Sequence, residues 1–198
     1  MWSFEQKAAR SGYTVIAGID EAGRGPLAGP VVSAAVVLPS RAAIAGIDDS
    51  KKLSPARRDL LFDRIYRTAT AIGLGIVEAA EIDRINILQA ALRSMAIAAR
   101  NLKPQAQYLL IDGSFQIPYR LPQEAITKGD SRSASIAAAS IIAKVTRDRM
   151  MAVYHRQYPQ YGFDRHKGYP TKAHREAIER HGSCPIHRKT FRGVGERT

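Results

Sequence analysis

Four carboxylates stand at the ends of expected strands and helices, where they could support metal-assisted hydrolysis. Asp20 and Glu21 close an apolar strand, Asp112 closes a second strand, and Asp130 comes just before a long helix. Adjacent strand ends in one sheet can converge, so we expect the four side chains to meet at one rim. Carboxylates gathered in this way repel one another unless cations neutralise them. Their hard oxygen ligands favour Mg²⁺ or Mn²⁺, and two such ions about 3.5 to 4 Å apart can activate a water and stabilise the leaving oxygen of a phosphodiester.

Each acid also has a purely structural interpretation, which the sequence leaves open. Asp130 before a helix suits a cap, and Asp112 followed by glycine suits a turn. Adjacent Asp20 and Glu21 would point to opposite faces of a regular strand. Both reach one site only if the strand breaks at Glu21, or if one of them contributes indirectly.

A glycine-rich turn follows the first acid pair, in GIDEAGRGPLAGP at residues 18–30. Glycines let a backbone approach a ligand closely, and such a backbone can hydrogen-bond to a sugar hydroxyl. The 2′-hydroxyl is the group that separates RNA from DNA. Gly23, Arg24 and Gly25 are therefore candidates for reading a ribose.

The same turn also fits a dinucleotide-binding fingerprint, with Asp48 at the spacing of a ribose-binding acid. That fingerprint requires a helix to begin in the turn. Pro26 and Pro30 interrupt it instead, and the following VVSAAVVL has the β-branched character of a strand. Asp20 and Glu21 would also repel a pyrophosphate, so we favour the nuclease interpretation.

Hydrophobic patterning predicts the elements that position these residues. We expect strands over 14–20, 31–38, 72–79, 108–112 and about 124–127, and helices after Ser54-Pro55, after Asn86, over about 133–155 and over 171–181. Serine, asparagine and proline mark the helix starts. The prediction is a mixed α/β domain at residues 1–157, with a C-terminal helical and basic region at 158–198 packed on it as part of one structural unit.

The charge predicts a polyanionic partner. The 198 residues carry 30 Lys and Arg against 18 Asp and Glu, a net charge of +12. The excess is concentrated after residue 143, where all five histidines and four of the eight tyrosines also lie. Basic residues interleaved with aromatics suit a surface that follows a sugar-phosphate backbone, although a solvated basic face has the same composition. A non-catalytic protein that coats nucleic acid would explain this charge but not the four acids.

Other sequence features indicate the cellular compartment of the protein. The longest apolar run, 31–38, is far too short to span a membrane, and the N-terminal residues lack a signal-like apolar core. Cys184 is the single cysteine, which fits a reducing compartment. We expect a cytoplasmic protein that makes no membrane contact, and a monomer.

Taken together, several blocks closely resemble the type 2 ribonucleases H, the bacterial ribonuclease HII family. They run in family order over residues 14–181: GIDEAGRGPLAGPVV, DDSKKLS, LLIDG, ITKGD followed by SIAAASIIAKVTRD, and HKGYPTKAH. The resemblance implies a ribonuclease H-like fold with a mixed five-stranded sheet flanked by helices and a C-terminal helical appendage. It also implies metal-dependent endonucleolytic cutting of RNA in RNA–DNA hybrids and 5′ to ribonucleotides embedded in duplex DNA. The products would carry 3′-hydroxyl and 5′-phosphate ends, and the role would be ribonucleotide excision and RNA primer removal.

The resemblance also assigns residues. The family's four catalytic, metal-holding acids match Asp20, Glu21, Asp112 and Asp130, and its Gly-Arg-Gly motif, which reads the ribonucleotide, matches Gly23, Arg24 and Gly25. Tyr169 matches the tyrosine that packs beside the DNA-side sugar, where a plain surface aromatic is the alternative. Lys51 and Lys52 fall in a block expected to contact phosphates.

Sister groups fit less well. Type 3 enzymes usually carry Gly-Thr-Gly or a similar turn and an extra N-terminal domain, for which thirteen residues before the first strand leave no room. Type 1 enzymes lack the Asp-Glu pair at the first strand. One departure from the type 2 pattern is the spacing H-x-x-C-x-x-H at His181, Cys184 and His187, a weak zinc signal without a fourth ligand.

Overall fold

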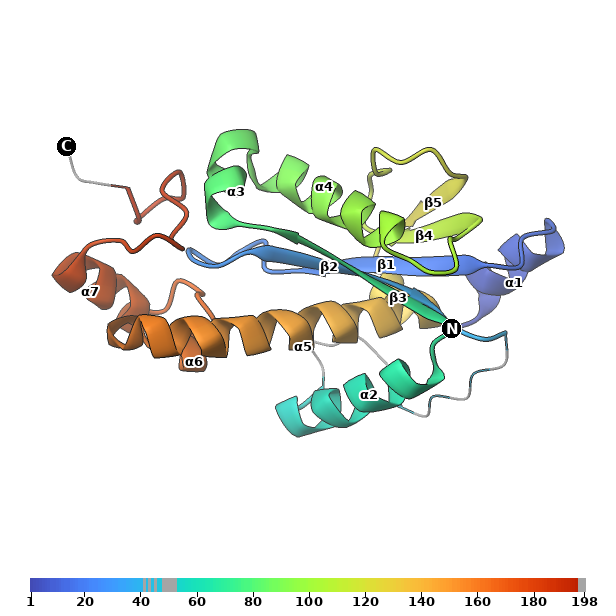
Figure 1. Ribbon diagram of the computed structural model, residues 1–198, viewed down its shortest axis with the longest axis horizontal. Helices are drawn as coiled ribbons and strands as arrows, with labels where there is room; N and C mark the ends of the chain where they lie inside the picture. The colour runs from blue at the N-terminus through green and yellow to red at the C-terminus, as the bar shows by residue number, and fades with distance from the viewer. Residues whose placement is uncertain (41, 43, 45, 48–52, 196–198) are drawn as a thin grey trace.

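A five-stranded mixed sheet forms the centre of the computed structural model, which describes residues 1–40, 42, 44, 46, 47 and 53–195 (Figure 1). The strands are β1 (Ile16–Ala22), β2 (Val31–Val37), β3 (Ala71–Val77), β4 (Tyr108–Asp112) and β5 (Gln123–Ile126). Their order is β3-β2-β1-β4-β5. The first three form an antiparallel meander, whereas β4 and β5 run parallel to β1. The predicted mixed five-stranded sheet is confirmed.

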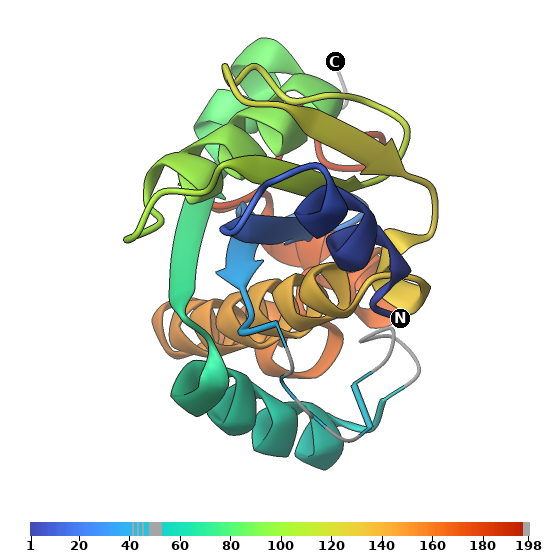
Figure 2. The same ribbon diagram turned by 90° about the vertical axis from the view of Figure 1, so that its right-hand side faces the viewer.

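The helices cover both faces of this sheet. They are α1 (Ser3–Arg10), α2 (Pro55–Thr68), α3 (Ala79–Ile85), α4 (Ile87–Arg100), α5 (Ala134–Gln157), α6 (Phe163–His166) and α7 (Lys172–His181), with short 3-10 turns at η1 (Gly129–Ser131) and η2 (Pro159–Tyr161). Seen end-on, α4 lies on one face, α5 lies on the other, and α2 lies outside α5 (Figure 2).

Capping side chains begin the helices where the sequence predicts. The Ser54 hydroxyl accepts a hydrogen bond from the Arg57 N–H, and Pro55 occupies the first turn of α2. The Asn86 side chain accepts from two N–H groups at the start of α4. Ser133 caps α5 and Thr171 caps α7. These bonds satisfy N–H groups that have no partner within the helix.

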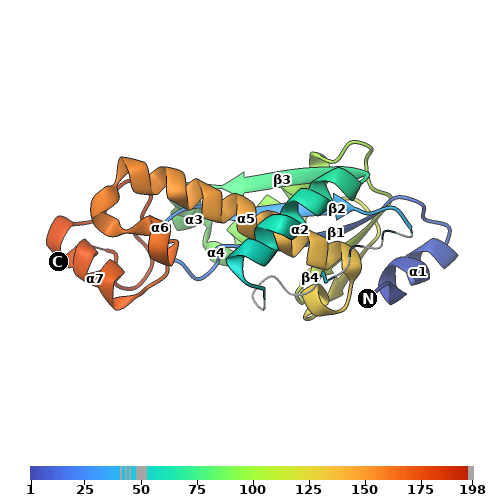
Figure 3. The ribbon, with the colours of Figure 1, turned by 90° about the horizontal axis from the view of Figure 1, so that it is seen from below.

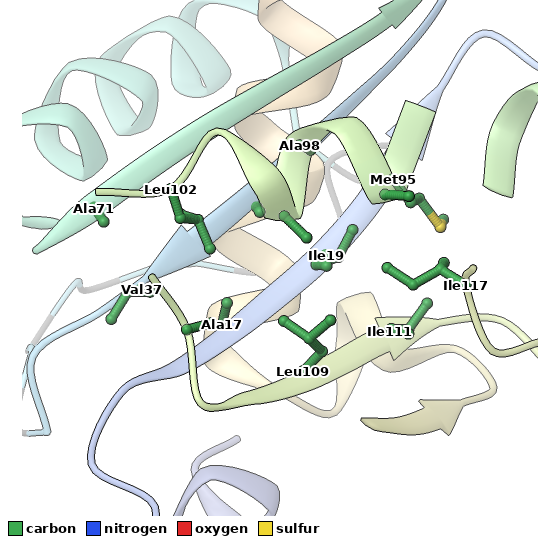
Figure 4. Packing of buried hydrophobic residues seen from close by; sticks show 14 residues of the cluster. Ala17, Ile19, Val37, Ala71, Met95, Ala98, Leu102, Leu109, Ile111 and Ile117 are labelled. Carbon is green, nitrogen blue, oxygen red and sulfur yellow. The ribbon is translucent and has the colours of Figure 1, made fainter. Parts of the chain in front are cut away.

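Strand alternation divides the core into two layers. Alternate residues of β1 and β4, including Ala17, Ile19, Leu109 and Ile111, pack against α4 through Met95 and its neighbours (Figure 4). The opposite face packs against α5. There the absence of a side chain at Gly18 is required, because a Cβ would lie 2.1 Å from the backbone carbon of Ser135. The N-terminal half of α5 therefore lies directly against β1.

A separate cluster holds the C-terminal elements against the rest of the molecule. It joins Leu27 and Ala28 of the glycine-rich turn and Met151 of α5 to buried residues between Tyr161 and Val194. Seen from below, α6 and α7 lie at the C-terminal end of α5, opposite the end occupied by α1 (Figure 3). The predicted appendage thus packs on the end of the molecule where the glycine-rich turn lies.

No helix in the described part of the chain has the length and apolar character needed to cross a bilayer.

Candidate active site

Asp20 and Asp112 lie side by side on neighbouring parallel strands. The last register pair of β1 and β4 is Ile19 with Ile111, so each aspartate is the next residue along its strand. Because Ile19 and Ile111 face α4, alternation turns both aspartates toward α5. The carboxyl ends of β1 and β4 therefore bring Asp20 and Asp112 together, as the sequence predicted for these two acids.

The Asp20 carboxylate is buried and crowded by negative charge. Its side chain is 3% exposed, and its Oδ1 accepts a hydrogen bond from the Glu21 N–H at 2.7 Å. Burial raises the pKa of Asp20 well above its ordinary value, and the charges of Glu21 and Asp112 raise it further. A hydrogen bond with the Ser140 side chain on α5 partly opposes this rise in pKa. Burial and the neighbouring negative charges therefore make the charged form of Asp20 costly unless a cation compensates it.

Glu21 joins this group although the strand does not break there. The β1–β2 ladder continues through Glu21 with Ser33 to Ala22 with Val32, so a departure from strand geometry, one of the two predicted possibilities, does not occur. Burial raises the pKa of Glu21, Arg24 opposes that rise, and Asp112 adds to it. The Arg24 Nη1 lies 3.4 Å from the Glu21 Oε1. The Glu21 carboxyl therefore lies within electrostatic reach of Asp112 while its backbone keeps strand geometry.

Asp130 is buried in the 3-10 turn that precedes α5. Its alternative interpretation as the cap of that helix is wrong, because the Ser133 hydroxyl performs this role. The turn is tied to the other acids by its first residue, since the Gly129 N–H donates to the Asp112 Oδ1 at 2.6 Å. Asp130 therefore follows directly after the residue that binds Asp112.

The acidic side chains do not adopt a complete metal-coordination geometry in this structure. Among the described residues, no group of three or more His, Cys, Asp or Glu side chains is arranged to hold a metal ion. The donor chemistry nevertheless fits a hard divalent cation, because the buried carboxyl of Asp20 and the half-buried carboxyls of Glu21 and Asp112 repel one another and present oxygen ligands whose charge such an ion would neutralise.

The glycine-rich turn lies between these acids and Tyr169. Gly23 has a φ of +101°, and a Cβ there would lie 2.1 Å from the Arg147 Nε, so glycine is required. A Cβ at Gly25 would instead lie 3.6 Å from the Tyr169 Cε1, an ordinary contact. Tyr169 is 42% exposed, and the edge of its ring lies next to Gly25 with room for one methyl group between them. The turn leads into β2 and not into a helix, which excludes the dinucleotide fingerprint.

A groove of about 600 Å³ extends from Tyr169 along the side of α5. Its basic lining comprises Arg58, Lys144, Arg149, Arg165 and Lys167, and its acidic lining comprises Asp59, Asp148 and Asp164. The Lys144 Nζ lies 6.0 Å from the centre of the Tyr169 ring and 2.7 Å from Asp148. Five basic and three acidic side chains line the groove, so its charge is moderately basic.

Three predicted residues, Asp48, Lys51 and Lys52, lie outside the described part of the chain.

The predicted zinc pattern does not assemble. His181 is exposed, whereas the Cys184 Sγ lies 3.1 Å from the His187 Nδ1 and the His187 Nε2 lies 3.1 Å from the His174 Nε2. Burial, together with the nearby His174, lowers the pKa of His187 to about 4. His174, Cys184 and His187 form a buried, hydrogen-bonded packing cluster beneath Tyr169, whose carbonyl oxygen lies 2.9 Å from the His174 Nδ1.

Sequence reasoning missed three residues that support the site: Ser140 beside Asp20, and the buried arginines Arg147 and Arg188 beneath the glycine-rich turn. Nothing in their spacing identifies them. The available signal for Ser140 was its place on the small-residue face of the long helix.

Known proteins share both the sequence and the fold. A family model described as Ribonuclease HII matches residues 17–194. The ribonuclease HII of Geobacter metallireducens is 59% identical over 196 residues, which cover 99% of this chain and 92% of the relative. The solved ribonuclease H2 from Pyrococcus horikoshii OT3 has a TM-score of 0.76 at 28% identity and covers 91% of this chain and 95% of that one. The RNase HII of Archaeoglobus fulgidus, solved in complex with PCNA, has a TM-score of 0.77 at 27% identity and covers 93% of this chain and 98% of its own.

Proposed function

Because the chain belongs to the ribonuclease HII family, and is thus a hydrolase acting on RNA–DNA hybrids, we propose how its own residues perform that reaction. It cuts the RNA strand of hybrids and the phosphodiester 5′ to a ribonucleotide embedded in duplex DNA, leaving 3′-hydroxyl and 5′-phosphate ends. Its roles are ribonucleotide excision and RNA primer removal.

The convergence of Asp20 and Asp112 beside the glycine-rich turn is the observation that carries this proposal. The two aspartates lie on the same face of adjacent strands, and the turn begins three residues after Asp20. A scissile phosphate held at the acids therefore places the neighbouring ribose near Gly23 to Gly25. Chemistry and sugar recognition occupy one continuous surface.

Divalent metal dependence is typical of this family, and the donor set of this chain suits it. Asp20, Glu21, Asp112 and Asp130 are the residues that would hold Mg²⁺ or Mn²⁺, and two ions would balance their four charges. When bound, such ions supply an activated water and stabilise charge on the leaving oxygen. The Ser140 side chain and the Gly129 N–H orient the acids by binding Asp20 and Asp112.

Substrate contacts divide into two kinds. Gly23, Arg24 and Gly25 read the 2′-hydroxyl, and Tyr169 packs against the sugar of the following deoxynucleotide. The basic residues of the groove beside Tyr169, together with Lys51 and Lys52, contact phosphates without reading sequence.

The chain forms one structural unit with two parts. Residues 1–157 form the catalytic core, and residues 158–198 pack on it within the same structural unit. The protein is a cytoplasmic monomer.

A pair of matched duplexes tests the proposed function. One contains a single ribonucleotide and the other is all DNA, and both are incubated with the protein and Mg²⁺ or Mn²⁺. We expect a single cut 5′ to the ribonucleotide and none in the all-DNA duplex. Binding of both duplexes without cutting would overturn the proposal and favour a non-catalytic nucleic-acid-binding protein.

A further inference from the structure

Two arginines are buried beneath the glycine-rich turn, and their hydrogen bonds go to backbone carbonyl oxygens. Arg188 is 0% exposed and Arg147 is 1% exposed. Burial lowers the pKa of Arg188 to about 9 and that of Arg147 to about 10. Burying a cation is costly unless its donors are satisfied. Two buried cations directly beneath the glycine-rich turn therefore suggest a role in the function of that turn.

Arg188 binds four carbonyl oxygens of this turn. Its Nη2 donates to Gly23 at 2.6 Å and to Gly29 at 2.9 Å, and its Nη1 donates to Arg24 at 3.0 Å and to Pro26 at 2.8 Å. Its Nε donates to Gly29 at 3.0 Å. All three guanidinium nitrogens therefore bind a single stretch of backbone.

Backbone hydrogen bonds between the C-terminal segment and the glycine-rich turn hold Arg188 in this position. The Arg188 N–H donates to the Leu27 carbonyl at 2.8 Å, and the Gly29 N–H donates to the Ile186 carbonyl at 2.8 Å. Ala28 and His187 form an antiparallel bridge between these bonds. The C-terminal segment is thus fixed along the turn, and its arginine side chain points beneath it.

The carbonyl directions determine where the turn's N–H groups point. In a planar trans peptide, the C=O of one residue and the N–H of the next point in opposite directions. Among the described residues, the one cis peptide bond is Lys103–Pro104, so the peptide bonds of the turn are trans. The Pro26 carbonyl points to Arg188, and the following Leu27 N–H accordingly donates elsewhere, to Gly168 at 2.8 Å.

The same rule applies to the two peptides that the substrate would meet. Because the Gly23 and Arg24 carbonyls point inward to Arg188, the N–H groups of Arg24 and Gly25 point outward. Neither N–H donates a hydrogen bond to any residue in the described ranges. Gly25 also faces the ring of Tyr169. Two free donors are therefore held side by side at the surface where a ribose would lie.

We propose that Arg188 is a positioning residue for ribose recognition, which sets the peptide planes of the turn so that the Arg24 and Gly25 N–H groups meet the 2′-hydroxyl and its adjacent phosphate. This inference rests on the proposed function. A planar guanidinium with five donors can hold four carbonyls at once, whereas a lysine ammonium with three donors cannot. Arg188→Lys keeps the positive charge but removes the planar set of donors that binds the four carbonyl oxygens.

The test measures discrimination between sugars. All measurements use the Asp20→Asn protein without divalent metal, so that the duplex is bound but not cut. Discrimination is the dissociation constant for an all-DNA duplex divided by the dissociation constant for the same duplex with one ribonucleotide. Arg188→Lys should reduce this ratio about tenfold, because both outward N–H groups lose their alignment. Affinity for all-DNA duplex should stay within about twofold, since the net charge is unchanged.

Two controls separate positioning from loss of stability. Arg192→Lys makes the same exchange at an exposed position four residues further along and should leave the ratio unchanged. Ile178→Ala weakens the cluster that holds the C-terminal elements without touching the turn carbonyls. A folded Arg188→Lys protein with an unchanged ratio would overturn the proposal. So would an Ile178→Ala protein of equal thermal stability that loses discrimination equally.

Amide NMR keeps the proposal testable if Arg188→Lys does not fold. In the Asp20→Asn protein, the Arg24 and Gly25 amide resonances should shift more with the ribonucleotide duplex than with all-DNA duplex, and equal shifts would refute the outward donors. A parent ratio near one would instead refute ribonucleotide recognition itself, and with it the proposed function.

Discussion

Gly25 and Tyr169 face each other across a gap that one methyl group would begin to fill. A Cβ at Gly25 would lie 3.6 Å from the Tyr169 Cε1, which is van der Waals distance without a clash. The glycine is therefore not required by the fold of the free protein. It keeps space open between the turn and the aromatic ring, where the proposed ribose lies.

Gly25→Ala should accordingly separate recognition from stability. We expect a thermal unfolding midpoint close to that of the parent, because the added methyl meets no backbone. We also expect kcat/KM on a single-ribonucleotide duplex to fall about tenfold or more, since a small displacement of the sugar misplaces the scissile phosphate. Calorimetry and initial rates measure the two effects. Unchanged kcat/KM would show that the sugar does not enter this gap.

Gly23→Ala should do the reverse and destabilise the protein. Its φ of +101° strains any other residue, and its Cβ would lie 2.1 Å from the Arg147 Nε. We expect a loss of about 2 kcal/mol or more in the free energy of urea unfolding. Gly113→Ala is the matched control, because its φ of +107° imposes the same strain with nothing within 4 Å of the added carbon. Equal losses at the two positions would contradict the proposed clash.

Tyr169→Ala should affect substrates unequally. In the proposed junction role, the ring packs on the deoxynucleotide that follows a single ribonucleotide, and losing such an aromatic contact should lower kcat/KM about tenfold. On a long RNA–DNA hybrid, with no adjacent DNA-side sugar on the cut strand, the loss should be smaller. Phe115→Ala, at a more exposed aromatic between β4 and β5, should change neither rate. An equal loss on both substrates would contradict the junction role.

The histidine cluster predicts a pH-dependent stability. Burial lowers the pKa of His187 to about 4 from the ordinary value of 6.5, so the folded protein holds it neutral. The unfolded chain takes up the proton first as pH falls. The stability that neutral His187 contributes is therefore full above about pH 6.5 and is lost progressively as pH falls toward 4.

Urea unfolding of the parent at pH 7.5, 6.5, 5.5 and 5.0 checks this direction. His181→Gln, at an exposed histidine outside the cluster, should retain the same pH dependence. The raised pKa values of Asp20 and Glu21 act with the opposite sign, so the His187 contribution is measured as the stability difference between the parent and His187→Asn. A difference that does not change between pH 7.5 and 5.0 would contradict the neutral His187.

Local signals made much of the fold predictable from the sequence. The helices that begin after Ser54 and Asn86 are capped by hydrogen bonds between a side chain and a backbone N–H three residues further along. Such local caps can be recognised from the sequence alone. The pairing of Asp20 with Asp112 was also predictable, because parallel strands bring their carboxyl ends to one edge.

What the sequence did not predict depends on contacts between distant residues. The helix α1 is held by its Glu5 carboxylate, which accepts hydrogen bonds from Ser133 and Ser135 far along the chain. The third strand was predicted to reach Ala79 but ends at Val77, because the unpredicted helix α3 begins at Ala79. Arg188 lies more than 150 residues from the carbonyls it binds, and no local spacing indicates that.

Asp20→Asn tests the central claim most directly. The exchange removes one proposed metal ligand while preserving size and the contact with the Glu21 N–H, so binding should survive and chemistry should not. With Mg²⁺ or Mn²⁺ and a duplex carrying one ribonucleotide, we predict that single-turnover cutting falls about a thousandfold or more. The dissociation constant should stay within about threefold of the parent, and Asp63→Asn, at an exposed acid of α2, should cut normally. An Asp20→Asn protein that cuts 5′ to the ribonucleotide at the parent rate would contradict the account.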